Sequence, residues 1–209
     1  MSRRVIEPDR LFVRDDRAAP RRTPAPHSPQ SGVWSRRRWL GLALAAAGAQ
    51  FAGCGRGEPP PAVAAETQAL AALRTASLAN LDGGTEALSQ WAGQPWLINF
   101  WATWCPPCVH EMPDLDRLQA DFPQVRFIGL GIDSIESMRD FRERVPVGYP
   151  LLEARAEGLD WSRALGNEAG GLPFTMILDA SGNIRYRVAG RIDPEVLAAQ
   201  LRPLTDDAS

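Results

Sequence analysis

Apolar residues follow two patterns along this chain of 209 residues, and each pattern predicts a different element. Two nearly continuous apolar runs, at residues 96–102 and 125–132, are typical of strands buried on both faces. Between them, apolar side chains recur at helical spacing and predict a helix from residue 106 to about residue 122: Met112, Leu115, Leu118 and Phe122. The remaining pattern predicts strands at 76–81, 149–152, 174–178 and 184–188, and helices at 86–91, 135–145, 161–165 and 194–201.

The order of these elements predicts the fold class. A strand–helix–strand unit comes first, and a hairpin and a closing helix follow it. Asp193 is expected to cap the closing helix, because Pro194 occupies a first-turn position there. We therefore expect an α/β domain at residues 71–205, with a central mixed sheet flanked by helices on both faces, and a short tail at residues 206–209.

Residues 1–53 have the composition of an export region. Residues 1–33 are rich in Arg, Pro and Asp and are typical of disordered chain. Residues 35–40 read Ser-Arg-Arg-Arg-Trp-Leu and precede a short apolar run, which predicts a cleaved export signal. The run is shorter than the roughly 20 residues of a membrane-spanning helix, although a short anchor or a buried helix is the alternative. The arginine triplet resembles the twin-arginine export motif and also fits an ordinary Sec signal.

Cys54 closes this region and is a candidate for lipid attachment. Residues 51–54 read Phe-Ala-Gly-Cys and resemble a bacterial lipobox, in which the cysteine is lipidated after cleavage. The alternative is a chance cysteine near a signal-peptidase site. Residues 54–70 are rich in Pro and Ala and are expected to form a flexible spacer between the anchor and the domain.

Charge is divided unevenly along the chain. Residues 1–53 hold 10 Arg and 4 acidic residues, whereas residues 54–209 hold 13 Arg and 21 acidic residues. An acidic main body argues against nucleic acid as a partner. The three cysteines are too few for a disulfide scaffold, so the core must carry the stability.

The candidate chemistry lies in Cys105 and Cys108, where a strand meets a helix. We expect Cys105 at the helix N-cap, more exposed than Cys108, with its thiolate stabilised by the helix N-terminus as the attacking nucleophile. Cys108, one turn further on, would resolve the mixed disulfide. Pro106 and Pro107 lack an N–H, so the N–H groups of Cys108 and Val109 are expected to serve Cys105. With fewer N–H donors to its sulfur, Cys105 is expected to be a less acidic thiol, which favours a reducing pair.

Other readings of the two cysteines are weaker. A zinc site needs four ligands, and the only histidines are His27 and His110, of which His110 is expected at the surface. Val109 stands where covalent haem attachment requires His. A purely structural disulfide would make no use of the strand-to-helix position. We therefore expect no metal and no cofactor.

The sequence around the two cysteines resembles that of a known family. Residues 99–108 read Asn-Phe-Trp-Ala-Thr-Trp-Cys-Pro-Pro-Cys, and residues 171–175 read Gly-Leu-Pro-Phe-Thr, which resembles the cis-proline loop of the thioredoxin superfamily. Together with the export signal, the wording is most similar to the TlpA/ResA branch of extracytoplasmic thiol-disulfide reductases. The resemblance covers about residues 71–205 and implies a thioredoxin-like fold.

The resemblance implies roles for further residues. Glu111 would handle a proton at the cysteines, and more so because Asn99 stands where cytoplasmic thioredoxins carry a buried Asp; the alternative for Glu111 is a solvated helix residue. Pro173 would be cis, and the backbone of Leu172 would pair with an extended thiol substrate. Trp104 would lie at the rim of the site as an apolar docking face, with Trp101 in the core.

These observations predict a protein-disulfide reductase that is tethered to a membrane outside the cytoplasm, on the periplasmic side, or soluble there if Cys54 is unmodified. Expected substrates are disulfides in exported proteins, including the haem-binding cysteines of apocytochrome c. A membrane thiol-disulfide electron donor would be a partner, and a monomer is expected. The alternatives are a disulfide-forming oxidase, a peroxiredoxin-like antioxidant, and a redox-dependent metal chaperone or binding module.

Overall fold

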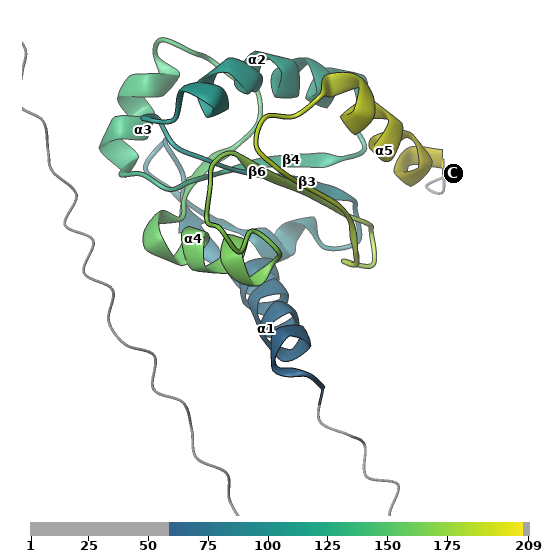
Figure 1. The fold of residues 1–209 in the computed structure, drawn as a ribbon. Coiled ribbons are helices and arrows are strands. Elements are labelled where there is room, and N and C mark those ends of the chain that lie inside the picture. Colours follow the sequence, from purple (N-terminus) through teal and green to yellow (C-terminus); the bar gives the residue numbers. More distant parts are fainter. Residues whose placement is uncertain (1–58, 207–209) are drawn as a thin grey trace, which may run out of the picture. The chain divides into compact units, whose positions relative to one another are not determined.

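The structure, a computed structural model, describes residues 59–206 (Figure 1). Its elements, in chain order, are α1 (Pro61–Thr75), β1 (Ser77–Ala79), β2 (Thr85–Ala87), the 3-10 helix η1 (Leu88–Trp91), β3 (Trp96–Trp101), α2 (Pro106–Asp121), β4 (Arg126–Gly131), α3 (Ile135–Arg142), β5 (Leu151–Glu153), α4 (Arg155–Ala164), β6 (Phe174–Leu178), β7 (Ile184–Ala189) and α5 (Pro194–Asp206).

Five of the strands form one mixed sheet in the order β5-β4-β3-β6-β7. Strand β4 runs parallel to both β3 and β5, whereas β6 is antiparallel to β3 and β7. Strands β1 and β2 form a separate antiparallel pair. The predicted α/β fold with a mixed sheet is therefore confirmed, and β3 lies at its centre.

Helices cover both faces of this sheet (Figure 1). Leu97 and Trp101 of β3 belong to the cluster that α2, α3 and α5 cover. Ile98 and Phe100 point to the opposite face, where α1 and α4 pack. Successive side chains of a strand alternate between faces, so burial on both sides makes every residue of β3 apolar or internally bonded.

Two short elements differ from the sequence prediction. The helix expected at residues 86–91 divides into β2 and η1. Helix α4 begins at Arg155, six residues before the expected start. The prediction missed its first turns because they are polar, largely exposed and carry little apolar periodicity. Gly158 allows this early start, since a Cβ there would lie 2.6 Å from the Ala154 Cβ.

Residues 61–70 correct the predicted spacer. They form the first part of α1, which opens with Pro61 in its first turn and is rich in Ala, a strong helix former. Ala69 and Leu73 are buried in the cluster below the sheet. The folded unit thus begins at Pro61 rather than at residue 71, and the low-complexity composition concealed a packed helix.

The predicted closing helix also extends beyond its expected end. Asp193 caps it as predicted, since its Oδ1 accepts from the N–H groups of Glu195 at 2.9 Å and Val196 at 3.2 Å. Helix α5 then continues to Asp206, with Pro203 inside it.

The predictions for the export region, including Cys54, lie outside the described residues. Among residues 59–206, no helix is both long and apolar enough to cross a membrane.

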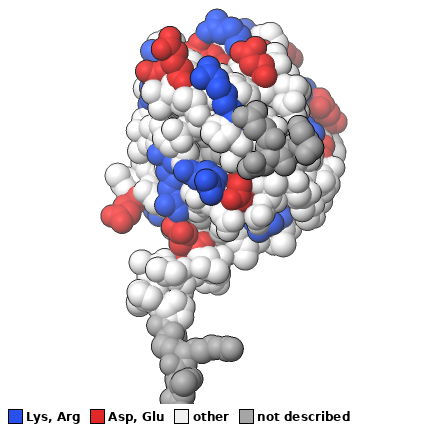
Figure 2. Space-filling model, turned by 90° about the vertical axis from the view of Figure 1, so that its right-hand side faces the viewer, with Lys and Arg blue, Asp and Glu red and all other residues white. Residues whose placement is uncertain are grey.

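Figure 2 shows one face of the domain, on which arginine and carboxylate side chains are interspersed. Charge on this face is therefore balanced locally rather than gathered into a patch of one sign.

Candidate active site

The central strand leads directly into the dithiol. After β3, the chain turns at Thr103 and Trp104, and the Cys105 N–H donates to the Ala102 C=O at 3.2 Å. Cys105 is the N-cap of α2, as predicted, and two prolines fill the first positions of the helix. Prolines fit there because the first N–H groups of a helix have no partner within it.

Cys105 and Cys108 form a disulfide, with their Cα atoms 5.3 Å apart. The Cys108 N–H donates to Cys105 Sγ at 3.3 Å, as expected. The Val109 N–H does not: it donates to the Cys105 C=O at 3.2 Å, so one expected donor to the sulfur is lost. Cys105 is 5% exposed and Cys108 is fully buried, which gives the predicted order of accessibility.

The two tryptophans beside the cysteines have opposite environments. Trp101 is fully buried and packs on Phe141, with ring centroids 5.0 Å apart. Trp104 is 65% exposed, which is unusual for so large an apolar side chain. The structure therefore places Trp101 in the core and Trp104 at the surface beside Cys105.

Glu111 is fully buried, so the alternative of a solvated helix residue is wrong. Asn99 Nδ2 donates to its Oε1 at 2.7 Å, and the Ile192 N–H donates to its Oε2 at 3.0 Å. Burial raises the pKa of Glu111 to about 7, and the bonds from Ile192 and Asn99 and the charge of Arg191 only partly oppose this. A carboxyl group with this pKa can exchange a proton near neutral pH. The neighbouring His110 is exposed, as expected.

Asn99 connects Glu111 to β6. Its Nδ2 also donates to Thr175 Oγ1 at 3.0 Å, and all three side chains are buried. Sequence reasoning identified Asn99 and Glu111 but not their partners Thr175 and Ile192. Thr175 lies in the Gly-Leu-Pro-Phe-Thr segment, which offered a signal, whereas Ile192 contributes only a backbone N–H, which its residue type does not reveal.

The loop before β6 lies at the same end of the sheet as the dithiol. Because β6 is antiparallel to β3, its first residue Phe174 pairs with Phe100 near the end of β3. The Leu172–Pro173 bond is cis, as the resemblance implied. The Pro173 C=O accepts from the Gly190 N–H at 2.8 Å, whereas the N–H and C=O of Leu172 bond to no other described residue. That backbone is therefore free to bond an extended ligand.

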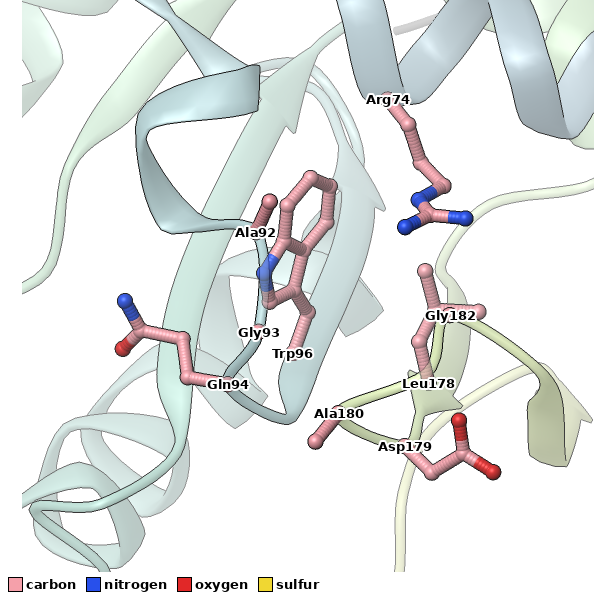
Figure 3. Close-up of a pocket in the computed structure, with 9 residues that line it drawn as sticks. All are labelled: Arg74, Ala92, Gly93, Gln94, Trp96, Leu178, Asp179, Ala180 and Gly182. Atoms are coloured by element: carbon pink, nitrogen blue, oxygen red, sulfur yellow. The ribbon is translucent and has the colours of Figure 1, made fainter.

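A small hollow at the other end of the sheet is separate from this site (Figure 3). Arg74 of α1, Trp96 at the start of β3 and Asp179 are among its lining residues. Gly182, with φ of +85°, lets the Arg74 side chain approach, since a Cβ there would lie 2.3 Å from Arg74 Nη1. The hollow has a volume of about 10 Å³, which is room for one water at most.

Within residues 59–206, no group of three or more His, Cys, Asp or Glu side chains is arranged to hold a metal ion. The chemistry that the described site can perform is thus that of two sulfurs, a buried carboxyl group and an open backbone.

Comparison with known proteins identifies the family. A sequence profile of the AhpC/TSA family matches residues 70–187, more than half of the chain. The chain belongs to the AhpC/TSA family. Its fold is thioredoxin-like, and its relatives include thiol-disulfide oxidoreductases of the kind that the sequence resemblance indicated.

Two relatives and one solved structure illustrate the similarity of this AhpC/TSA member. It is 33% identical to the thiol:disulfide interchange protein DsbE of Escherichia coli (strain K12) over 120 residues, which cover 56% of this chain and 61% of DsbE. It is 27% identical to the thiol-disulfide oxidoreductase ResA of Geobacillus thermodenitrificans over 131 residues, 61% of this chain and 72% of ResA. The structure of MTB dsbF in mixed oxidised and reduced forms aligns with a TM-score of 0.53 and 28% identity, covering 64% of this chain and 98% of dsbF. The chain thus spans less than two thirds of the length of DsbE.

Proposed function

We propose that this protein is an extracytoplasmic thiol-disulfide oxidoreductase that reduces disulfides in exported proteins. The observation that carries the proposal is the Cys105–Cys108 pair at the N-terminus of α2, one helical turn from the buried carboxyl group of Glu111. The names of DsbE and ResA, which describe thiol-disulfide exchange, support it.

The reaction is a two-electron exchange in two steps. The Cys105 thiolate attacks one sulfur of the substrate disulfide, forms a mixed disulfide and releases the first substrate thiolate. Cys108 then attacks Cys105 Sγ, which releases the second substrate thiolate and leaves the Cys105–Cys108 disulfide. The substrate gains two electrons and two protons, and a dithiol donor must later return them to the protein.

Glu111 is the proton carrier in this scheme. It follows Cys108 by three residues on the same helix, so their side chains lie on one face. Its carboxylate takes the Cys108 proton when Cys108 attacks. During re-reduction, the donor attacks Cys105, and protonated Glu111 returns the proton to the departing Cys108 thiolate. A pKa of about 7 suits a group that must both accept and donate.

The substrate would bind across the cis-proline loop. The N–H and C=O of Leu172, which bond to no other described residue, support main-chain hydrogen bonds to an extended segment, and Pro173 shapes the loop beside the cysteines. The exposed indole of Trp104 adds an apolar contact.

The direction of electron flow is testable by one pair of measurements. Among the described residues, the Cys108 N–H is the one donor to Cys105 Sγ, which favours a less acidic thiol and a reducing pair. We expect insulin-disulfide reduction and a midpoint potential near that of thioredoxin, about −270 mV. A potential near −120 mV, roughly that of DsbA, would instead establish the disulfide-forming oxidase.

The substrate and the location are finer proposals. Cys108→Ser should trap substrates on Cys105 as mixed disulfides, because the resolving thiol is absent. Apocytochrome c among the trapped proteins would support a role in cytochrome maturation, and its consistent absence would reject that role. Mass spectrometry of the mature N-terminus tests the lipid anchor, since an unmodified Cys54 thiol excludes the tether.

A further inference from the structure

A carboxylate two residues beyond the end of the neighbouring strand β4 holds the turn that leads into Cys105. Parallel strands β3 and β4 end at the same edge of the sheet, and the Ile132 N–H continues their pairing by donating to the Trp101 C=O at 2.8 Å. The next residue, Asp133, directs its carboxylate at the turn. The Thr103 N–H donates to Asp133 Oδ2 at 3.2 Å, and Thr103 Oγ1 donates to the same oxygen.

The pattern of donors requires a carboxylate at residue 133. The other oxygen, Oδ1, accepts from the Ser134 N–H at 2.8 Å. Partial burial would raise the pKa of Asp133, but the bonds from Thr103 and Ser134 hold it below its ordinary value, so the group is ionised at neutral pH. An Asn side chain would replace one acceptor with an NH₂ donor and leave either Thr103 or Ser134 without its bond.

The held turn determines where Trp104 lies. Thr103 and Trp104 are the two central residues of the turn that the Cys105 N–H closes on Ala102. Trp104 remains 65% exposed, so contacts within the core do not fix its indole. A side chain that is ordered before binding loses less entropy when a partner docks on it.

We propose that Asp133 is a positioning residue, which holds Thr103 so that Trp104 is presented beside Cys105 to an incoming protein disulfide. The proposal rests on the proposed reductase function and adds a residue that makes no contact with the reacting sulfurs. In this proposal Asp133 affects the docking of a protein substrate on Trp104 and leaves the exchange reaction at the sulfurs unchanged.

A capping role for α3 does not account for Asp133. Ser134 is the N-cap of α3, and its Oγ accepts from the Ser137 N–H at 3.2 Å. The helix thus has its own cap. The Ser137 side chain also helps to lower the pKa of Asp133, but among the described residues the hydrogen bonds to Asp133 Oδ2 come from Thr103. Ser134→Ala is therefore a matched control, because it removes the helix cap and keeps both bonds to Thr103.

The test is steady-state reduction of insulin by the full chain, with dithiothreitol as the electron source. We expect Thr103→Val and Asp133→Ala, which removes every acceptor for Thr103, to raise the KM for insulin about five-fold while kcat changes by less than about two-fold. Thr103→Ser, which keeps the hydroxyl, should restore the wild-type KM, and Ser134→Ala should not change it. Combining Thr103→Val with Trp104→Ala should give no further loss beyond Trp104→Ala alone, because both changes remove the same docking surface.

Multiplicative losses in that double variant would overturn the proposal, as would an equal rise in KM for Ser134→Ala. A wild-type protein with no insulin turnover would reject the reductase function instead. Amide hydrogen exchange measures the stability of the turn directly: Asp133→Ala should accelerate exchange at Thr103 and Cys105 about ten-fold, and Ser134→Ala should not. Unchanged exchange at both amides would reject the positioning role.

Discussion

Asn99 Nδ2 lies 2.7 Å from Glu111 Oε1, and this contact joins the central strand to the helix that carries the dithiol. The amide donates to the carboxyl group and brings no charge of its own. Burial therefore remains the dominant influence on Glu111 and keeps its pKa near 7.

The first prediction concerns the pH dependence of re-reduction. The structure holds the disulfide, so its Glu111 pKa applies to attack by a donor on Cys105. The second-order rate constant, calculated on the concentration of dithiothreitol thiolate, should fall as pH rises through about 7. Glu111 loses its proton over this range and can no longer protonate the departing Cys108 thiolate. Glu111→Gln should abolish this dependence on pH and slow re-reduction about 10²-fold at low pH. Stopped-flow fluorescence measures both rates.

A carboxylate elsewhere on α2 provides the control for that experiment. Asp121 is exposed at the end of the helix, so Asp121→Asn removes the same charge without touching Glu111. Its rate profile should match the wild type. A Glu111→Gln protein that keeps the step near pH 7 would show that another group carries the proton.

A second prediction concerns stability. Folding raises the pKa of Glu111 from 4.5 to about 7, so the folded state binds the proton more tightly. The stabilisation from this group is complete below about pH 4.5 and is lost as pH rises through about 7. The loss amounts to about 3 kcal/mol. Urea unfolding of the oxidised wild type and of Glu111→Gln at several pH values isolates this contribution. If the unfolding free energies of the two proteins change with pH in the same way, Glu111 is not the group responsible.

Replacing the amide partner by an acid gives a third prediction. Asn99→Asp would place a second carboxyl group against Glu111, and two such groups cannot both ionise cheaply. The titration near pH 7 should move upward by at least about one unit, and the free energy of unfolding at about pH 8 should fall by about 2 kcal/mol or more. Measured re-reduction rates and urea curves report the two effects.

Thr175→Val is the companion variant for Asn99→Asp. It removes the 3.0 Å bond from Asn99 and leaves the bond to Glu111 in place. We expect a loss of about 1–2 kcal/mol in unfolding free energy and no shift in the pH dependence. A shift equal to that of Asn99→Asp would mean that general loosening of the core, rather than charge, controls Glu111.

A fourth prediction tests the corrected start of the folded unit. Leu73 of α1 is fully buried, and Leu73→Ala should lower the free energy of unfolding by about 2–5 kcal/mol. Val63, in the same helix, is 53% exposed, so Val63→Ala should change it by less than about 0.5 kcal/mol. Thermal or urea unfolding compares the two, and equal small effects would mean that α1 does not belong to the cooperative unit.

The sequence was a reliable guide where periodicity and burial agree. The run at residues 96–102 predicted β3 because a strand buried on both faces is nearly continuously apolar, with Asn99 as its one polar residue. The dithiol at the N-cap of α2 followed from the spacing of Cys105 and Cys108. Both predictions rest on local rules that the tertiary structure does not override.

The missed features depend on contacts between distant segments. Helix α1 was predicted as a spacer because an Ala-rich segment has few large apolar residues to show a helical period, and only Ala69 and Leu73 of it are buried. The bond from Ile192 to Glu111 crosses 81 positions of sequence through a backbone group. Asp133 likewise acts 30 positions away, on Thr103. No pattern within a single segment reveals such pairings.

The short segment from Gly190 to Ile192 has a practical consequence for spectroscopy. Its first amide bonds Pro173 and its third bonds Glu111, so two protons on one stretch of chain face the two sides of the site. In an isotope-edited NMR spectrum, the Gly190 signal would follow occupancy of the loop and the Ile192 signal would follow the charge on the carboxyl group. One titration would then separate ligand docking from proton movement, without a label on either sulfur.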